Sequence, residues 1–184
     1  MNLNKGNNAG QFYWFHAIVE DVDDPLQIGR VRVRCIGFHN EDNNILPVEN
    51  LPWAHQILPV TSASYKGIGR SPTGLQVGSW VIGFFRDGEI SQDPIIMGSI
   101  PSVTDGVPDI PATALTHYPN NHVIHTKSGH EFQWDDTSGS ETISLKHKTG
   151  SVFSIDKDGN ILIDAKTSAN ANVTIKGARI DLNP

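Results

Sequence analysis

The final segment of the chain, residues 120–184, alternates apolar and polar positions with a period of two, and a turn interrupts it about every ten residues. The inward candidates come in pairs two residues apart: Phe132 and Trp134, Ile143 and Leu145, Phe153 and Ile155, Ile161 and Ile163, Val173 and Ile175, Ile180 and Leu182. Even spacing combined with this alternation is typical of a stacked array of short β-strands, so we expect no helix in this segment.

A single ribbon of this kind leaves both of its edges unpaired and one apolar face in water. The simplest remedy is to wrap several copies around one axis, which closes the edges and covers the apolar faces. The segment therefore predicts an obligate oligomer.

Residues 12–100 read as a separate all-β unit without a clear helix. The expected strands are 12–22, 29–37, 52–57, 79–85 and 93–100, with a polar loop at 40–50 and a glycine-rich loop at 67–74. Five short strands in this length are typical of a small closed barrel of the OB type. The tryptophans of these strands, Trp14, Trp53 and Trp80, are expected to fill the core or the contacts between protomers.

The remaining segments complete the predicted order of domains. Residues 1–11 are polar and form a flexible N-terminus, whereas residues 101–119 contain four prolines and few large apolar residues, which indicates an extended linker. We therefore expect an N-terminus at 1–11, an OB-type domain at 12–100, a linker at 101–119 and the β array at 120–184.

Composition limits the classes of partner and compartment. The 184 residues carry a formal net charge of −6, which argues against nucleic acid or an anionic membrane as the main partner. Cys35 is the single cysteine, so no intrachain disulfide forms. The N-terminus has neither a basic nor an apolar region, and no apolar run is long enough to span a bilayer. We expect synthesis in the cytoplasm without a signal peptide.

Four motifs of the first unit, in this order, resemble the central spike of contractile tails, a family that includes VgrG-type and baseplate assembly protein V-like proteins. They are DPLQIGRVRVR at 24–34, LPW at 51–53, GIGRSPTG at 67–74 and DPIIMG at 93–98. The segments TKSGHE at 126–131 and DGNI at 158–161 are similar to runs in the β-helices of these spikes. The resemblance covers roughly residues 12–184.

The resemblance implies a homotrimer at the centre of a virion tail baseplate or a related injection apparatus, either a tailocin or a secretion system. Three OB domains would attach to a trimeric hub, and three C-terminal segments would intertwine into a β-helix, or β-prism, that pierces the envelope of the target cell. The implied trimer core consists of Phe132, Ile143, Leu145, Phe153, Ile155, Ile161, Ile163, Val173 and Ile175. Trp134 is wide for a narrow prism and would lie at its broad end or point outward.

The C-terminal strand pattern continues to the last residue, so three chain ends would form a blunt platform with exposed strand edges. Its residues would be Ile180, Leu182, Asn183 and Pro184. In related spikes a small PAAR-type protein covers this platform, and we expect such a tip protein here. The spikes of T-even phages also carry a lysozyme domain between the barrel and the β-helix. The 19 residues of 101–119 are too few for one, so muramidase activity is not expected.

Arg30, Arg32 and Arg34 alternate along the second predicted strand and so share one face. A basic strand in an OB fold is able to hold a nucleic-acid backbone, but no stacking aromatic residues interleave with these arginines. We expect the arginines, together with Trp53, to form a solvated face or salt-linked contacts with the hub or a neighbouring protomer.

Histidines and acidic residues offer no convincing metal or catalytic site. His122 and His125 are three positions apart and therefore face opposite sides of a strand, so we expect no metal and no cofactor. The sequence around Asp158 reads as a hairpin turn rather than a calcium loop. Glu131 with Asp135 or Asp136 would resemble a glycosidase pair, but a thin prism has no cleft for a sugar chain.

Two alternatives to a non-enzymatic spike stay open at this point. The first is an OB-fold module that binds an oligonucleotide or a glycan and uses the β segment to trimerise. The second is a peptidoglycan hydrolase whose site does not match a known motif. Salt-dependent binding of single strands would support the first alternative, and zymography on cell walls would test the second.

Overall fold

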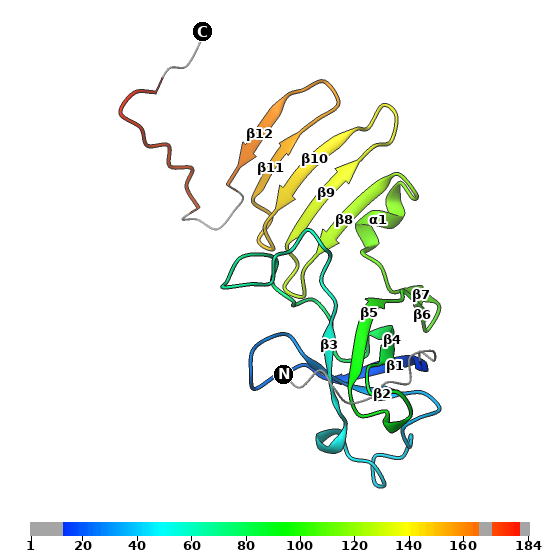
Figure 1. Cartoon of the computed structure of the whole chain (residues 1–184). Coiled ribbons are helices and arrows are strands. Elements are labelled where there is room, and N and C mark those ends of the chain that lie inside the picture. Colours follow the sequence, from blue (N-terminus) through cyan, green and yellow to red (C-terminus); the bar gives the residue numbers. More distant parts are fainter. Residues whose placement is uncertain (1–12, 166–170, 181–184) are drawn as a thin grey trace. The chain divides into compact units, whose positions relative to one another are not determined.

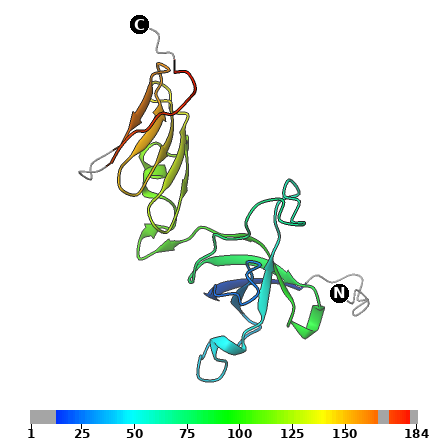
Figure 2. The ribbon, with the colours of Figure 1, turned by 90° about the vertical axis from the view of Figure 1, so that its left-hand side faces the viewer.

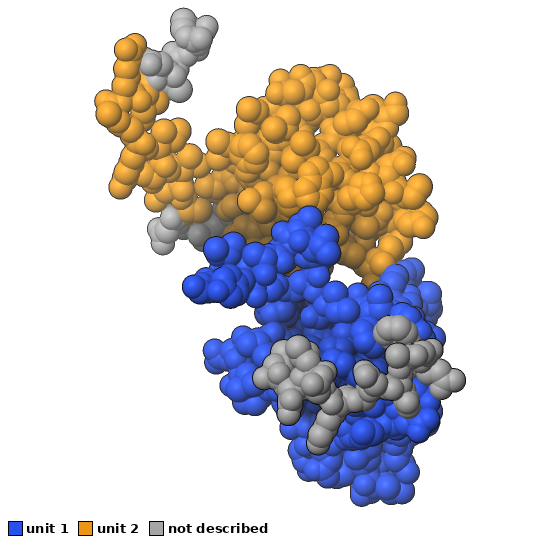
Figure 3. Space-filling model, in the orientation of Figure 1, with its two compact units in different colours: residues 1–108 blue, residues 109–184 orange. Residues whose placement is uncertain are grey.

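A computed structural model describes residues 13–165 and 171–180. The chain divides into two compact units, Met1–Pro108 and Asp109–Pro184, shown in different colours in Figure 3. The predicted flexible segment 1–11 lies outside the described residues. Each unit is built from its own sheet, and they are described in turn.

Unit 1 contains a closed five-stranded barrel in the order β1-β2-β3-β5-β4 (Figure 1). Its strands are β1 (Tyr13–Asp21), β2 (Val31–Cys35), β3 (Trp53–Gln56), β4 (Trp80–Phe85) and β5 (Pro94–Ser99). Short 3-10 turns, η1 (Val48–Asn50) and η2 (Gly88–Ile90), lie before β3 and before β5. Strands β3 and β5 pair in parallel, and every other pair is antiparallel. This is an OB-like barrel, so the all-β class and the predicted barrel are confirmed.

The barrel core follows from alternation within the strands. In β1 the buried side chains are Phe15, Ala17 and Val19, at every second position. Cys35, at the end of β2, is fully buried, and burial raises the pKa of its thiol to about 12. The single cysteine is therefore a core residue that is unreactive at neutral pH.

The same alternation places two tryptophans outside the core. Trp14 is 53% exposed and Trp80 is 38% exposed, because each lies one position from an inward residue of its strand. The expectation that they fill the core is wrong, whereas a role between protomers stays a prediction.

Barrel closure requires a residue without a side chain at one point of β4. The register between β4 and β5 shifts between Ile82 and Gly83. A Cβ atom at Gly83 would lie 2.0 Å from the carbonyl oxygen of Ile95 and 2.8 Å from the ring of Phe15. The close approach of β5 is therefore possible only with glycine here.

The segment predicted as an extended linker contains regular structure. A two-stranded sheet, β6 (Val103–Thr104) with β7 (Val107–Pro108), ends unit 1, and a short helix, α1 (Ala112–Thr116), begins unit 2. Its proline content suggested an extended chain, but Pro111 lies at the start of α1, where a missing backbone N–H costs no helical hydrogen bond.

Unit 2 contains a five-stranded antiparallel sheet in which each strand pairs with its neighbours in sequence (Figure 2). The strands are β8 (Asn121–His125), β9 (Glu131–Asp135), β10 (Thr142–Lys146), β11 (Val152–Ile155) and β12 (Ile161–Asp164). The positive-φ turn residues Gly129, Gly139, Gly150 and Gly159 lie between them, as predicted. Residues 171–180 are described but form no strand, so Val173 and Ile175 do not continue the sheet.

Candidate functional site

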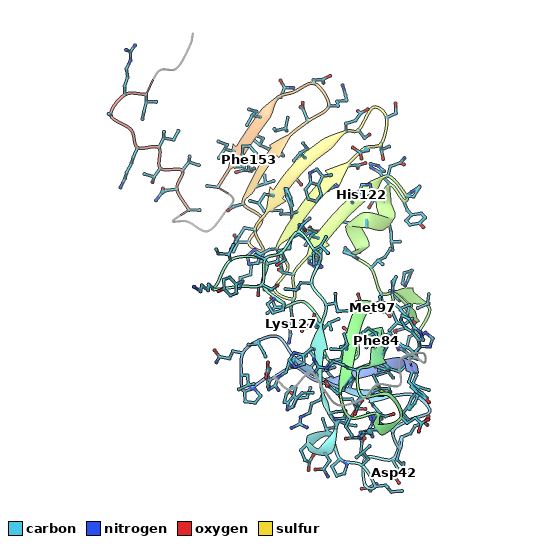
Figure 4. All side chains as sticks on the ribbon, in the orientation of Figure 1. Asp42, Phe84, Met97, His122, Lys127 and Phe153 are labelled. Atoms are coloured by element: carbon cyan, nitrogen blue, oxygen red, sulfur yellow. The ribbon has the colours of Figure 1, made fainter. Side chains whose placement is uncertain are left out.

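The register of the five-stranded sheet collects the apolar residues of unit 2 on one face. Directly opposite residues of paired strands project to the same side of a sheet. One cross-strand row therefore runs through His122, Trp134, Ile143, Ile155 and Ile161, and the next runs through Ile124, Phe132, Leu145, Phe153 and Ile163. We call the nine apolar residues of these rows the apolar face. Figure 4 marks His122 on β8 and Phe153 on β11.

Much of this apolar face is exposed to solvent in the single chain. Seven of its side chains are 37–64% exposed, from Trp134 to Ile161. Their exposed area is on the order of 700 Å², which exceeds the largest apolar patch of a typical soluble monomer, about 300–600 Å². An apolar surface of this size is characteristic of an interaction site.

The opposite face of the sheet is mostly polar, and α1 covers part of it. The side-chain amide of Asn121 donates to the carbonyl oxygen of Thr113 at 2.9 Å. The Thr113 hydroxyl donates to Glu131 at 2.5 Å, and Nδ1 of His117 lies 2.5 Å from a carboxylate oxygen of Asp135. These contacts hold α1 on the polar face, so the apolar face is the side without a helix.

Both carboxylates under α1 are stabilised as anions. The hydrogen bond from Thr113 lowers the pKa of Glu131, and Lys146 adds to the effect with Nζ at 3.3 Å. Burial opposes ionisation of Asp135, but hydrogen bonds from Thr137 and His117 outweigh it and lower the pKa of that carboxyl.

This geometry does not suit catalysis by Glu131 and Asp135. They lie four residues apart in β9, which corresponds to about 13 Å along a strand, well beyond the roughly 5–9.5 Å of glycosidase carboxyl pairs. His122 and His125 pair with residues of opposite faces, as expected. Within residues 13–165 and 171–180, no group of three or more His, Cys, Asp or Glu side chains is arranged to hold a metal ion.

In unit 1, two of the three predicted arginines contact Trp53. The guanidinium of Arg32 lies 4.4 Å from the centroid of the Trp53 ring, and that of Arg30 lies 5.3 Å from it. Arg30 also forms an ion pair with the buried carboxylate of Asp24 at 2.7 Å, which holds the pKa of Asp24 well below its usual range. Arg32 donates to the carbonyl oxygens of Glu49 and Leu51.

Arg34 is buried, with 7% of its surface exposed. Its guanidinium pairs with Glu20 at 2.5 Å and donates to Asn43 Oδ1 at 2.6 Å and to the carbonyl oxygens of Asn40 and Leu46. A solvated role is therefore wrong for Arg34, because its donors hold the loop 40–50 against β2. Contacts of Arg30, Arg32 and Trp53 with a hub or neighbouring protomer stay predictions.

The apolar face brings together seven of the nine predicted core residues and adds two that sequence reasoning missed or left open. Ile124 was missed although it alternates with His122 in the turn-bounded β8, and Trp134 falls on the apolar face by its register with Ile143. Of the predicted platform, Ile180 is 49% exposed outside any strand. Leu182, Asn183 and Pro184 lie outside the described residues.

Across the part of the chain that is described, no helix has the length and apolar character required to cross a membrane.

Comparison with known proteins gives one family match. The family described as the Gp5 N-terminal OB domain matches residues 37–160, about two thirds of the chain. The matched range includes β3, β4 and β5 of the barrel and extends through β11 of the unit 2 sheet.

Two curated relatives are similar to parts of the chain. Protein Gp5 of Vibrio phage KVP40 is 26% identical over 261 residues, which cover 90% of this chain and 62% of the relative. The pre-baseplate central spike protein Gp5 of Enterobacteria phage T4 is 48% identical over 79 residues, which cover 40% of this chain and 14% of the relative. The chain thus spans less than two thirds of the length of either relative.

The alignment with the Vibrio phage protein is longer than the chain itself. Its 261 positions exceed the 184 residues by 261 − 184 = 77, so the relative has at least 77 additional residues within the aligned region.

Proposed function

The chain belongs to the family of the Gp5 N-terminal OB domain, and on that premise we propose that it is the structural spike at the centre of a contractile-tail baseplate. In this proposal the protein acts as a homotrimer in the virion tail, attaches through its barrels to a trimeric hub, and pierces the target envelope when the sheath contracts.

The observation that carries the proposal is the apolar face of unit 2. Nine apolar side chains share one side of a five-stranded sheet, with α1 on the other side. Three such sheets with their apolar faces turned inward would form a triangular prism with a continuous core. Chain association would bury the surface that the single chain exposes, which is the arrangement expected of an obligate oligomer.

The mechanism we propose is mechanical. A closed prism would pair the strand edges at β8 and β12 with neighbouring protomers, so that no edge stays open. Axial force would then be shared among many backbone hydrogen bonds and a common core. This would let the spike transmit the thrust of the sheath without unfolding.

We propose that this protein works without an enzymatic step. The comparison with the Vibrio phage relative supports this view, because the additional residues that the relative carries within the aligned region have no counterpart in this chain. The wide separation of Glu131 and Asp135 along β9 supports it as well.

The further partners that we propose are a hub, a PAAR-type tip protein, and transiently the host envelope. Arg30, Arg32 and Trp53 are partly buried on the barrel, and their remaining surface would be available to the hub or to a neighbouring barrel. A purified hub protein that binds the barrel in a salt-dependent manner would support this contact.

The solution mass of the purified protein tests the proposal directly. Light scattering should give about three times the 20.1 kDa of one chain, and the trimer should resist SDS until the sample is heated. A protein that stays monomeric at high concentration would contradict the proposal, because the apolar face would then lack the expected partner.

A further inference from the structure

A groove in unit 1 lies beside the long loop that joins β3 to β4, residues 57–79. Its volume is about 750 Å³, and its lining includes Ile28, Leu58, Tyr65, Ile68, Lys66 and Arg70. Neither the trimer nor the spike function assigns a role to this groove.

The tip of the loop is a small hairpin with a defined conformation. Tyr65 and Ile68 pair as an isolated β-bridge, in which the Ile68 N–H donates to the Tyr65 carbonyl oxygen at 2.9 Å. Lys66 and Gly67, between them, have φ angles of 48° and 78°, the positive values that a two-residue type I′ turn requires. The turn therefore presents Lys66 at the tip of a preformed structure.

The middle of the loop is fixed by a hydrogen bond from the Arg70 N–H to the Ser62 hydroxyl at 2.8 Å. Gly69 permits this approach, since a Cβ atom there would lie 2.5 Å from the Ser62 oxygen. At the base, the Gln56 amide donates to the carbonyl oxygens of Gly29 at 2.6 Å and of Pro72 at 3.1 Å. The walls of the groove are thus held before any ligand arrives, which lowers the entropy lost on binding.

The charges in the groove differ from those on the rest of the barrel. Arg30, Arg32, Arg34 and Arg86 each form an ion pair with a carboxylate of the same unit. Among the described lysine and arginine residues of unit 1, Lys66 and Arg70 are the two without such a pair. Both line the groove, and its lining contains no acidic residue.

Apolar side chains lie beside these two cations. Tyr65 is 66% exposed, Ile68 is 67% exposed and Ile28 is 49% exposed. The Nζ atom of Lys66 lies 5.3 Å from the centroid of the Tyr65 ring, a cation–π contact that leaves the ammonium group without a carboxylate partner. On a chain of net charge −6, two such cations next to an exposed aromatic ring and two exposed isoleucines are complementary to a segment that is both acidic and apolar.

We propose that this groove docks an acidic, apolar peptide segment of a partner protein. Carboxylates of the segment pair with Lys66 and Arg70, and its apolar side chains cover Tyr65 and Ile68. A single-stranded nucleic acid fits less well, because the groove has one aromatic ring and two cations, whereas such binding depends on successive stacking side chains along a basic track. The proposal does not rest on the trimeric spike, since the groove lies within unit 1.

Fluorescence anisotropy of the full-length protein with three labelled probes tests the proposal. The first probe is a short peptide of glutamate, aspartate and leucine. The second is the same peptide with glutamine and asparagine in place of the acids, and the third is a single-stranded oligothymidine. The Lys66→Glu/Arg70→Glu variant removes the two cations, whereas Lys127→Glu/Lys148→Glu, in unit 2, changes the net charge equally and serves as the control.

We expect the acidic peptide to bind at least tenfold more tightly than its amide counterpart and than oligothymidine. Its affinity should fall at least tenfold in Lys66→Glu/Arg70→Glu and in Tyr65→Ala, and it should not change in the control. All four substituted side chains of the charge variants are exposed, and melting curves establish that each variant is folded. Lys66→Gln/Arg70→Gln should give an intermediate loss.

Equal binding of the acidic and amide peptides would overturn the proposal, as would an affinity that the groove variant leaves unchanged. Preferential binding of oligothymidine, abolished by Lys66→Glu/Arg70→Glu, would replace the peptide with a nucleic acid as the ligand. None of these readouts depends on the oligomeric state, so they separate failure of the groove from failure of the spike proposal.

Discussion

The substitution Leu145→Thr tests the apolar face at one of its central positions. Leu145 lies in β10 between Phe132 and Phe153 of the neighbouring strands, and it is 56% exposed in the single chain. Threonine keeps a high preference for strands, so the fold of the sheet is expected to persist while the apolar contact is lost.

The size of the effect follows from the exposed area. Covering the free part of Leu145 on association removes about 110 Å² of surface from water, a gain of about 3 kcal/mol per protomer. Threonine retains part of this, which leaves a loss of about 2 kcal/mol per protomer and about 6 kcal/mol per trimer. At 1.4 kcal/mol for each factor of ten, the trimer dissociation constant should rise about 10⁴-fold.

Leu162→Thr is the matched control. Leu162 is 52% exposed, but its register with Ser154 places it on the polar face. Light scattering over a dilution series compares both variants with the parent protein, and far-ultraviolet circular dichroism verifies that the strands persist. Leu145→Thr should dissociate at much higher concentration than the parent protein, whereas Leu162→Thr should not.

Equal dissociation of the two variants would refute the reasoning, because the side of the sheet would then make no difference. A Leu145→Thr protein that stays trimeric at every dilution would also refute it, since the residue would lie outside the interface.

Three further predictions concern the barrel. Arg34→Met should lower the free energy of unfolding by about 3–5 kcal/mol in urea titrations, because it leaves a partly buried carboxylate uncompensated. The exposed counterpart Arg86→Met should lower the free energy of unfolding by less than about 1 kcal/mol. Equal losses of stability in the two variants would contradict the difference in burial between Arg34 and Arg86. Gly83→Ala should destabilise the barrel by about 1–3 kcal/mol or more, whereas Gly98→Ala, with open space around its Cβ, should stay within about 0.5 kcal/mol in the same titrations. Asp24→Asn should lower the melting temperature near neutral pH and flatten its acid dependence. The lowered pKa of this carboxyl gives stability that is present above about pH 4 and is lost as the pH falls further, so parallel melting curves at all pH values would contradict this account.

Alternation within short segments determined most of the strands from the sequence alone. Each of the five barrel strands lies within its predicted range, and β9 to β12 contain the predicted pairs from Phe132 to Ile163. Local alternation is sufficient because successive side chains of a strand project to opposite faces, so seven residues of the apolar face were named correctly as neighbours on one side. The family resemblance was likewise readable, since it rests on motifs that are contiguous in the chain.

Only the tertiary structure decided which partners these faces and charges meet. The row of arginines in β2 gave no sign that Arg34 is buried, because its partners Glu20 and Asn43 come from other segments that pairing brings close. The parallel contact of β3 with β5 closes the barrel between residues about forty positions apart. Alternation is a local property, whereas burial and charge pairing depend on which distant segments the fold brings together.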